Sequence, residues 1–183
     1  MRDIVKISLR LFVITAIAGL ALGFTDDATN TPIAEQAEIA AMQARKSVLP
    51  DAEEFTEITE LPKDIDSAFS GAANGETVGY TAQVTVKGYG GNIEVMVGMS
   101  LDGKITGVNV GGSDFAETAG LGARAKEPWF SEQYTGLTPQ ITLGEDVDAI
   151  TAATRTSKAV TDGVNLAADY ILKLIENGGA AHE

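Results

Sequence analysis

The stretch that decides the fold is residues 78–110, VGYTAQVTVKGYGGNIEVMVGMSLDGKITGVNV. Its apolar residues alternate onto one face of a predicted strand that contains Ile93, Val95, Val97 and Met99. Asp102-Gly103 is a strong signal for a hairpin turn. Because short turns join the segments and no helix-length crossover separates them, we expect an antiparallel sheet. The expected strands are residues 78–87, 93–99 and 104–110.

A helix is predicted after this sheet, near the end of the chain. Beyond Ser157, apolar residues recur at helical spacing and form one core-facing stripe. The stripe comprises Val160, Val164, Ala167, Ala168, Ile171, Leu174 and Ile175. Asn177-Gly178-Gly179 then marks the end of the helix. Together these patterns predict an α+β fold, a mainly antiparallel sheet with flanking helices.

Two neighbouring regions have a biased composition. Residues 71–122 contain 13 of the 20 glycines, a density typical of turns, bulges and sites where another backbone or a ligand comes close. Residues 51–77 are acidic and less periodic, and we expect most of their charge to face solvent.

The overall composition excludes several classes of function. The 183 residues include 26 Asp and Glu against 13 Lys and Arg, a net charge of −13, which argues against nucleic-acid binding. The absence of cysteine excludes disulfides, thiol catalysis and thiolate metal sites. His182 is the only histidine, so the sequence offers almost no support for a Ser-His-Asp catalytic triad or a histidine-rich metal site. Redox chemistry in this chain would need an organic cofactor.

The N-terminal segment has the pattern of a single membrane span. Residues 1–10 carry a net charge of +2, whereas the other 173 residues carry 10 Lys and Arg against 25 Asp and Glu. The uncharged run 11–25 follows the basic segment directly. A membrane span that starts at Ile4 and ends at Phe24 would be about 31 Å long at ~1.5 Å per residue. This polarity favours a cytoplasmic N-terminus. A cleaved signal peptide, ending near Ala21-Leu22-Gly23, is an equal alternative.

The pattern also predicts how the chain is divided. Polar residues at 25–32 indicate a linker, after which Thr31-Pro32 begins an alanine-rich helix that ends before Pro50. The predicted parts are a membrane anchor at 1–25, a linker and stalk helix at 26–50, the folded domain at 51–177 and a flexible tail at 178–183.

Two segments do not look like ordinary scaffold. At the start of the predicted C-terminal helix, Thr151, Thr154, Thr156 and Ser157 place four hydroxyls near the N–H groups of a helix N-terminus, where a phosphate binds well. A threonine that simply caps the helix is the simpler interpretation of this cluster. In residues 117–122, ETAGLG, two glycines allow a planar ligand to approach the backbone, although a surface loop has the same composition.

Taken together, the two segments resemble one known family. The combination of E-T-x-G-L-G with a downstream D-x-I-[ST]-x-A-T-x-T is similar to the extracytoplasmic FMN-binding domain that RnfG and NqrC share. RnfG belongs to the Rnf ferredoxin:NAD oxidoreductase, and NqrC belongs to the sodium-pumping quinone reductase. Three further stretches agree with RnfG. They are Val48-Leu49-Pro50-Asp51-Ala52-Glu53, Gly88-Tyr89-Gly90-Gly91 and Asp102-Gly103-Lys104-Ile105.

The resemblance implies a role for individual residues. Thr156 matches the threonine whose hydroxyl is esterified by the phosphate of FMN, and Asp148 belongs to the sequence that a flavin transferase recognises. Ala152 stands where the family usually has Gly, and Ala119 stands where it usually has Pro. The other cofactor-binding residues that the resemblance implies are Glu117, Thr118, Gly120, Leu121, Gly122, Thr151, Ala153, Thr154 and Ser157.

The function that the resemblance implies is electron transfer through covalently bound FMN, in a membrane-bound, ion-translocating ferredoxin:NAD oxidoreductase. The chain would be an enzyme only as a redox component of this translocase, with no substrate-turnover site of its own. Its partners would be the other membrane subunits of the Rnf complex, a flavin transferase during maturation and the lipid around its anchor, with no nucleic acid. Two alternatives stay open: a secreted or anchored FMN carrier for another reductase, and a cofactor-free assembly or interaction protein.

The charge asymmetry at the N-terminus gives a testable topology. Because Arg2, Lys6 and Arg10 lie on one side of the apolar run, residues 26–183 are expected outside the cytoplasm of a single-pass protein of the cell membrane. Protease added to intact spheroplasts should therefore digest this part of the chain. Protection in spheroplasts, with digestion only in inverted vesicles, would reverse the topology.

Overall fold

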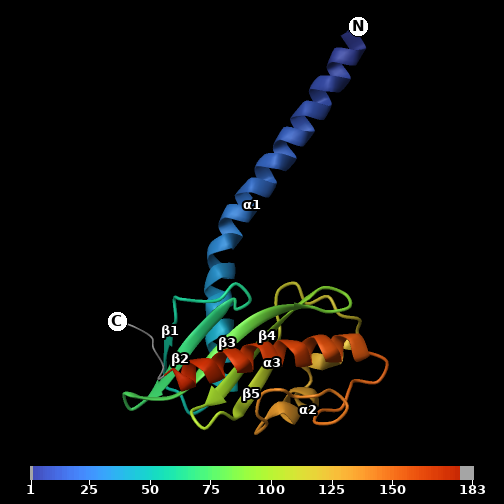
Figure 1. Cartoon of the computed structure of the whole chain (residues 1–183). Helices are drawn as coiled ribbons and strands as arrows, with labels where there is room; N and C mark the ends of the chain where they lie inside the picture. The colour runs from blue at the N-terminus through green and yellow to red at the C-terminus, as the bar shows by residue number, and fades with distance from the viewer. Residues whose placement is uncertain (1, 178–183) are drawn as a thin grey trace. The chain divides into compact units, whose positions relative to one another are not determined.

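The structure is a computed structural model that describes residues 2–177, and for residues 2–3 and 25–37 it describes the backbone alone. The predicted tail at 178–183, with His182, lies outside the described residues. The chain divides into two compact units, Met1–Met42 and Gln43–Glu183. In chain order (Figure 1), the elements are α1 (Arg2–Val48), β1 (Glu54–Glu57), β2 (Ser67–Ala73), β3 (Glu76–Lys87), β4 (Asn92–Ser100), β5 (Ile105–Gly111), the 3₁₀ helix η1 (Gly122–Lys126), α2 (Pro128–Ser131), the 3₁₀ helix η2 (Glu132–Tyr134) and α3 (Thr154–Glu176).

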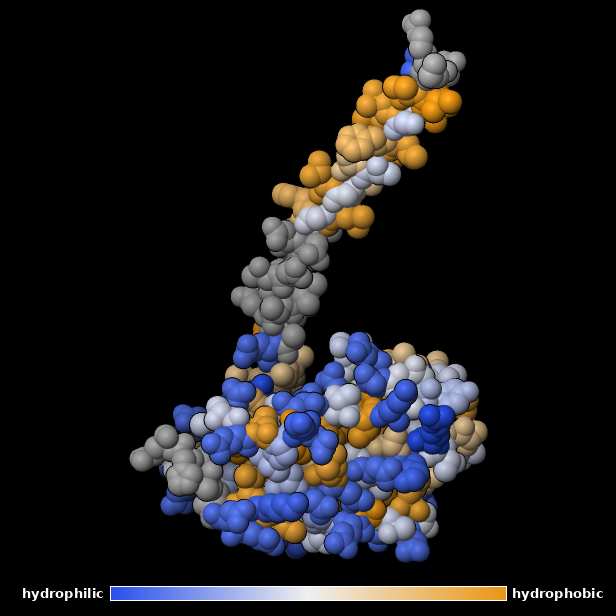
Figure 2. Space-filling view, turned by 45° about the horizontal axis from the view of Figure 1, so that its top comes forward, coloured by the Kyte–Doolittle hydropathy of each residue, from blue (hydrophilic) through white to orange (hydrophobic). Residues whose placement is uncertain are grey.

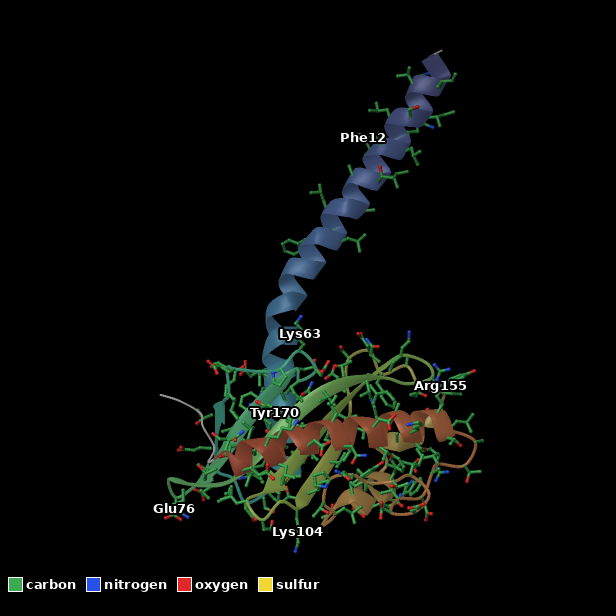
Figure 3. The ribbon with its side chains drawn as sticks, in the orientation of Figure 1. Phe12, Lys63, Glu76, Lys104, Arg155 and Tyr170 are labelled. Carbon is green, nitrogen blue, oxygen red and sulfur yellow. The ribbon has the colours of Figure 1, made fainter. Side chains whose placement is uncertain are left out.

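The first unit consists of helix α1 up to Met42. Its segment Ile4–Phe24 is long and apolar enough to cross a membrane, and its side chains, Phe12 among them, are exposed (Figures 2 and 3). The helical backbone continues through residues 25–32, where the sequence predicted a linker. A proline removes one N–H from the helical ladder and kinks a helix, but it does not always end one, and here Pro32 lies within α1.

The second unit is built on a five-stranded sheet. Its strands lie in the order β1-β2-β3-β4-β5, and every neighbouring pair is antiparallel, as the short turns predicted. Strands β1 and β2 come from the acidic region 51–77, for which the sequence pattern predicts no strand. β1 has four residues, and β2 has the sequence SAFSGAA, so neither carries a run of β-branched residues. Sheet pairing stabilises them instead, since β2 pairs with β3 and β1 pairs with β2.

The predicted pattern of β4 and of its turn is confirmed. Ile93, Val95, Val97 and Met99 are all buried in the core. At the turn into β5, Gly103 has a φ of +79° and donates its N–H to the carbonyl of Ser100. A glycine adopts this left-handed conformation without strain, which explains the hairpin signal at this position.

Helix α3 covers one face of the sheet and packs on β3, β4 and β5 (Figure 1). Its predicted stripe is confirmed, since Val160, Val164 and Ile171 are fully buried, as are both alanines of the stripe. Gly163 allows the close approach, because a Cβ there would lie 3.0 Å from a methyl carbon of Val86 on β3. α3 ends at Glu176, and Asn177 is its C-cap.

The opposite face of the sheet holds the end of α1. A row of four glycines crosses strands β2 to β5, and we call it the glycine seat; its members are Gly71, Gly79, Gly98 and Gly107. Val48 and Leu49 lie on this row and are 1% exposed. A Cβ at Gly98 would overlap the carbonyl oxygen of Val48, and one at Gly107 would lie 2.9 Å from its Cα. The carbonyl of Val48 also accepts a hydrogen bond of 2.5 Å from the Thr106 hydroxyl.

The seat changes the expected division of the chain. Residues 43–50 were predicted to belong to the stalk, yet they lie within the second unit. The physical reason is that Val48 and Leu49 have large apolar side chains, and the glycine seat lets them pack directly on the backbone of the sheet. Lys46 adds a hydrogen bond of 2.6 Å from its ammonium to the carbonyl of Ala52.

The glycine seat gives a matched pair of substitutions. We expect Gly98→Ala to lower the free energy of unfolding by about 2 to 3 kcal/mol, because the new methyl group overlaps backbone that cannot move away cheaply. Gly111→Ala on β5 is the control, since its Cβ would meet nothing within 4 Å, and it should change stability by less than about 1 kcal/mol. Urea unfolding of the two variants measures both values, and equal effects would contradict the seat.

Candidate functional site

The turn between β3 and β4 carries the first part of the site. Gly88 donates its N–H to the carbonyl of Gly91 and closes a tight turn. The missing side chains let the segment after β5 lie against this turn, because a Cβ at Gly90 would overlap the carbonyl oxygen of Ala116 and one at Gly91 would lie 2.7 Å from that of Asp114. The backbone of the glycine-rich turn is therefore open to contact from the loop that contains Glu117.

Glu117 uses this opening. Its Oε1 accepts the N–H groups of Tyr89 and Gly90, at 2.7 and 3.0 Å. Its Oε2 accepts the hydroxyl of Thr156, at 2.8 Å. One carboxylate thus joins the β3–β4 turn, the loop after β5 and the start of α3.

The start of α3 presents Thr156 to this carboxylate. The N-cap of the helix is Ala153, whose side chain has no oxygen, so the simpler interpretation of the threonine cluster as a helix cap does not describe this helix. Thr156 is 2% exposed, whereas Thr151 and Thr154 are exposed. A buried hydroxyl needs a partner, and Glu117 provides it.

Gly122 leaves room for this hydrogen bond. A Cβ at Gly122 would overlap Oε2 of Glu117 and would lie 2.7 Å from Oγ1 of Thr156. Gly88 leaves room for the other carboxylate oxygen, since a Cβ at Gly88 would overlap Oε1 of Glu117. Glycines therefore flank the carboxylate on both sides, and any larger residue would displace it.

A pocket of about 350 Å³ opens where these segments meet. It is lined by Tyr89, Glu117, Thr118, Leu121, Gly122, Ala152, Ala153, Thr154, Arg155 and Thr156. Arg155 lies at the N-terminal end of α3, far from Tyr170 on the same helix (Figure 3), and its guanidinium is 5.9 Å from the centre of the Tyr89 ring.

The helix terminus and Arg155 favour an anion at the start of α3. The first N–H groups of a helix have no partner within the helix, and the helix dipole adds a partial positive charge there. Thr154, Arg155 and Thr156 supply these groups and line the pocket. The guanidinium of Arg155 adds a full positive charge, and the exposed Leu121 adds an apolar surface beside it.

Buried hydrogen bonds hold the start of α3 in place. Ser157 is fully buried, and its hydroxyl donates to the carbonyl of Ala153 and accepts the N–H of Ile150, at 3.1 and 2.9 Å. One turn further on, Thr161 donates to the carbonyl of Ser157 and is 2.8 Å from the hydroxyl of Tyr134. Burial raises the pKa of Tyr134 to about 12, so this hydroxyl stays protonated at neutral pH.

The structure brings most of the predicted site residues together, but not all of them. Glu117, Thr118, Leu121, Gly122, Ala153, Thr154 and Thr156 line the pocket, whereas Gly120, Asp148, Thr151 and Ser157 do not. Ser157 instead holds the loop that precedes α3, through its hydrogen bonds to Ile150 and Ala153. Asp148 is exposed, and its N–H donates to the side-chain oxygen of Gln133 at 2.8 Å.

Three lining residues were absent from the predicted set, namely Tyr89, Ala152 and Arg155. The signals for them were present in the sequence, because Tyr89 interrupts the glycine-rich turn and the other two lie inside the threonine cluster. Ala152 has a φ of +61°, a left-handed conformation that favours glycine. Of the two residues that depart from the family pattern, Ala152 thus occupies a position where glycine has a physical advantage.

Comparison with known proteins identifies relatives over most of the chain. Residues 88–169 match the model of the FMN-binding domain family. The chain is 37% identical to the G subunit of the Na⁺-translocating ferredoxin:NAD⁺ oxidoreductase complex of Acetobacterium woodii, over 88% of each chain. It is 32% identical to the G subunit of an ion-translocating oxidoreductase complex of Methanosarcina acetivorans, over 93% of this chain and 95% of that one.

Two solved structures share the fold. The C subunit of the Na⁺-translocating NADH-quinone reductase of Parabacteroides distasonis superimposes with a TM-score of 0.50 and 22% identity, over 59% of this chain and 62% of that one. NqrC of Shewanella oneidensis gives a TM-score of 0.51 and 17% identity, over 73% and 74% of the two chains. The likeness confirms the predicted α+β fold.

The conformation of Ala152 gives a prediction on stability. We expect Ala152→Gly to raise the free energy of unfolding by about 0.5 to 1 kcal/mol, because the relief of the left-handed strain exceeds the extra chain entropy of glycine. The neighbouring Ala153→Gly is the control: its φ is −129°, so it should lower stability instead. Denaturant unfolding distinguishes the two, and a loss of stability in both would contradict the assignment of strain to Ala152.

Proposed function

Because the chain belongs to the family of G subunits of ion-translocating oxidoreductase complexes, we propose that it carries FMN and transfers electrons within a membrane-bound ferredoxin:NAD oxidoreductase of this kind. The match of residues 88–169 to the FMN-binding domain supports the cofactor. The observation that carries the proposal is the pocket at the start of α3, because all of its lining residues fall within the matched range.

The residues of the pocket fit the two ends of FMN. The N–H groups at the start of α3, with Arg155, suit the phosphate. Leu121 and Tyr89 offer apolar and aromatic surface to the flavin ring, and Thr118 offers a hydroxyl to its polar edge. Bound FMN would supply the redox chemistry, for which the side chains of this chain have no equivalent. The chain's own task is then to hold the ring, orient it and tune it through nearby charge.

We further propose that the FMN phosphate is esterified to the hydroxyl of Thr156. Thr154 and Thr156 both line the pocket, but only Thr156 has its hydroxyl held by a carboxylate. It also occupies the esterified position of the family pattern. A covalent tether suits a domain outside the cytoplasm, where a dissociated flavin would be lost by dilution. The exposed Asp148 would belong to the surface that a flavin transferase recognises.

The remaining assignments concern location and partners. We propose that Ile4–Phe24 anchors the chain in the membrane, with the N-terminus in the cytoplasm and the FMN-binding domain outside. The hydropathy of this segment supports the anchor, and the three basic residues that precede its uncharged run 11–25 support the orientation. The partners would be the other subunits of the complex, the lipid around the anchor and, during maturation, the flavin transferase.

The attachment site can be tested on protein isolated from its own membranes. Thr156→Ala should abolish covalent flavin, seen as loss of in-gel fluorescence and of the mass of FMN, because the attachment hydroxyl is gone. Thr154→Ala is the matched control, and any flavin that it retains should still map to Thr156 in the peptide masses. Both variants should stay folded, since the buried stripe of α3 is untouched.

Three outcomes would contradict the proposal. A flavin peptide modified at Thr154 would move the attachment site. Covalent FMN that persists in Thr156→Ala would exclude Thr156. Colourless wild-type protein of unmodified mass, isolated from membranes that contain the transferase, would favour the cofactor-free alternative.

A further inference from the structure

We propose that Glu117 is the base that accepts the proton of Thr156 when the flavin is attached. The inference rests on the proposed attachment of FMN to Thr156. It adds a residue of this chain to a reaction whose remaining groups would belong to the transferase.

The two oxygens of the Glu117 carboxylate have different hydrogen-bond partners. Oε1 is held by two backbone N–H groups, those of Tyr89 and Gly90, which the β3–β4 turn fixes in place. Oε2 is left to accept the hydroxyl of Thr156, at 2.8 Å. A general base must lie within hydrogen-bond reach of the proton that it removes, and Oε2 meets this condition before any ligand binds.

The surroundings keep this contact in place. Thr156 is 2% exposed, so bulk water has little access to its hydroxyl. The hydroxyl lies on a rigid helix whose first turn is tied to the preceding loop through Ser157. Gly122 and Gly88 leave the space that the carboxylate fills. Thr156 also lines the pocket, where the phosphate of a flavin would sit beside the N–H groups of α3.

The chemistry balances with one co-reactant, a flavin nucleotide activated as a phosphoanhydride, such as a flavin dinucleotide. FMN itself would have to expel hydroxide, which is a poor leaving group. Oγ1 of Thr156 forms a bond to the flavin phosphorus, and the phosphoanhydride bond from that phosphorus breaks, so the nucleoside monophosphate leaves with the electron pair. The proton of Oγ1 goes to Oε2 of Glu117. Nothing is oxidised or reduced.

The test is the rate at which purified transferase and flavin dinucleotide add the mass of FMN to the purified chain. Glu117→Gln keeps an oxygen for Tyr89 and Gly90 and places an amide N–H₂ against Thr156, so the contact survives without a proton acceptor. We expect kcat for attachment to fall about 100-fold or more, while the KM for the acceptor chain stays within about threefold. Asp114→Asn, an exposed carboxylate of the same loop, is the matched control and should react like the wild type.

A second variant moves the carboxylate without removing it. The Cβ of Gly122→Ala would occupy the space between Oε2 of Glu117 and Oγ1 of Thr156, so it should slow attachment as strongly as Glu117→Gln. Thermal unfolding of each variant shows whether it is folded, and only folded variants are compared. Attachment within threefold of the wild-type kcat in either folded variant would overturn the proposal.

The outcomes distinguish this inference from the proposed function. If the wild type gains flavin at Thr156 and folded Glu117→Gln does so equally fast, Glu117 is not the base and the attachment site stands. If the wild type gains flavin at another residue, the attachment site itself is wrong. A loss confined to KM in Glu117→Gln would assign the residue to recognition by the transferase, and the base would be refuted.

Discussion

The site depends on one carboxylate that holds three distant segments of the chain together. Glu117 contacts the β3–β4 turn through two N–H groups and α3 through the hydroxyl of Thr156. Taken singly, each of these segments is a glycine-rich turn, a surface loop or a helix start. Joined by these hydrogen bonds, they define a pocket beside the hydroxyl of Thr156. Its interactions are made before any ligand is present, which lowers the entropic cost of binding.

The carboxylate can do this because the scaffold beneath it is rigid. The antiparallel sheet is covered by α3 on one face and by the end of α1 on the other. Glycine serves both purposes in this fold: in the glycine seat it admits a backbone, and at Gly88 and Gly122 it admits a charged side chain. Beside turns such as that at Gly103, the concentration of glycine in residues 71–122 therefore has two further structural causes, packing and site construction.

The sequence predicted those parts of the fold that local physics decides. Alternation identified β4, helical spacing identified α3, and Asp102-Gly103 identified the turn between β4 and β5. β1 and β2 were missed because their residues gain a strand conformation only through pairing, β2 with β3 and β1 with β2. The two motifs indicated Glu117 and Thr156, but no periodicity reveals that residues 39 positions apart share a hydrogen bond. Tyr89 was missed although it visibly interrupts the glycine-rich turn, because only the tertiary structure places that turn at the pocket.

The glycine seat also imposes an order on folding during synthesis. Val48 and Leu49 leave the ribosome before any strand, but the last glycine of their seat, Gly107, follows about 60 residues later. Val48 and Leu49 are therefore without their seat for several seconds at ordinary rates of translation. Thr156 emerges later still, on the helix that completes the core. Under the proposed attachment at Thr156, the flavin transferase would meet a finished domain, and attachment would act as a checkpoint that only correctly folded chains pass.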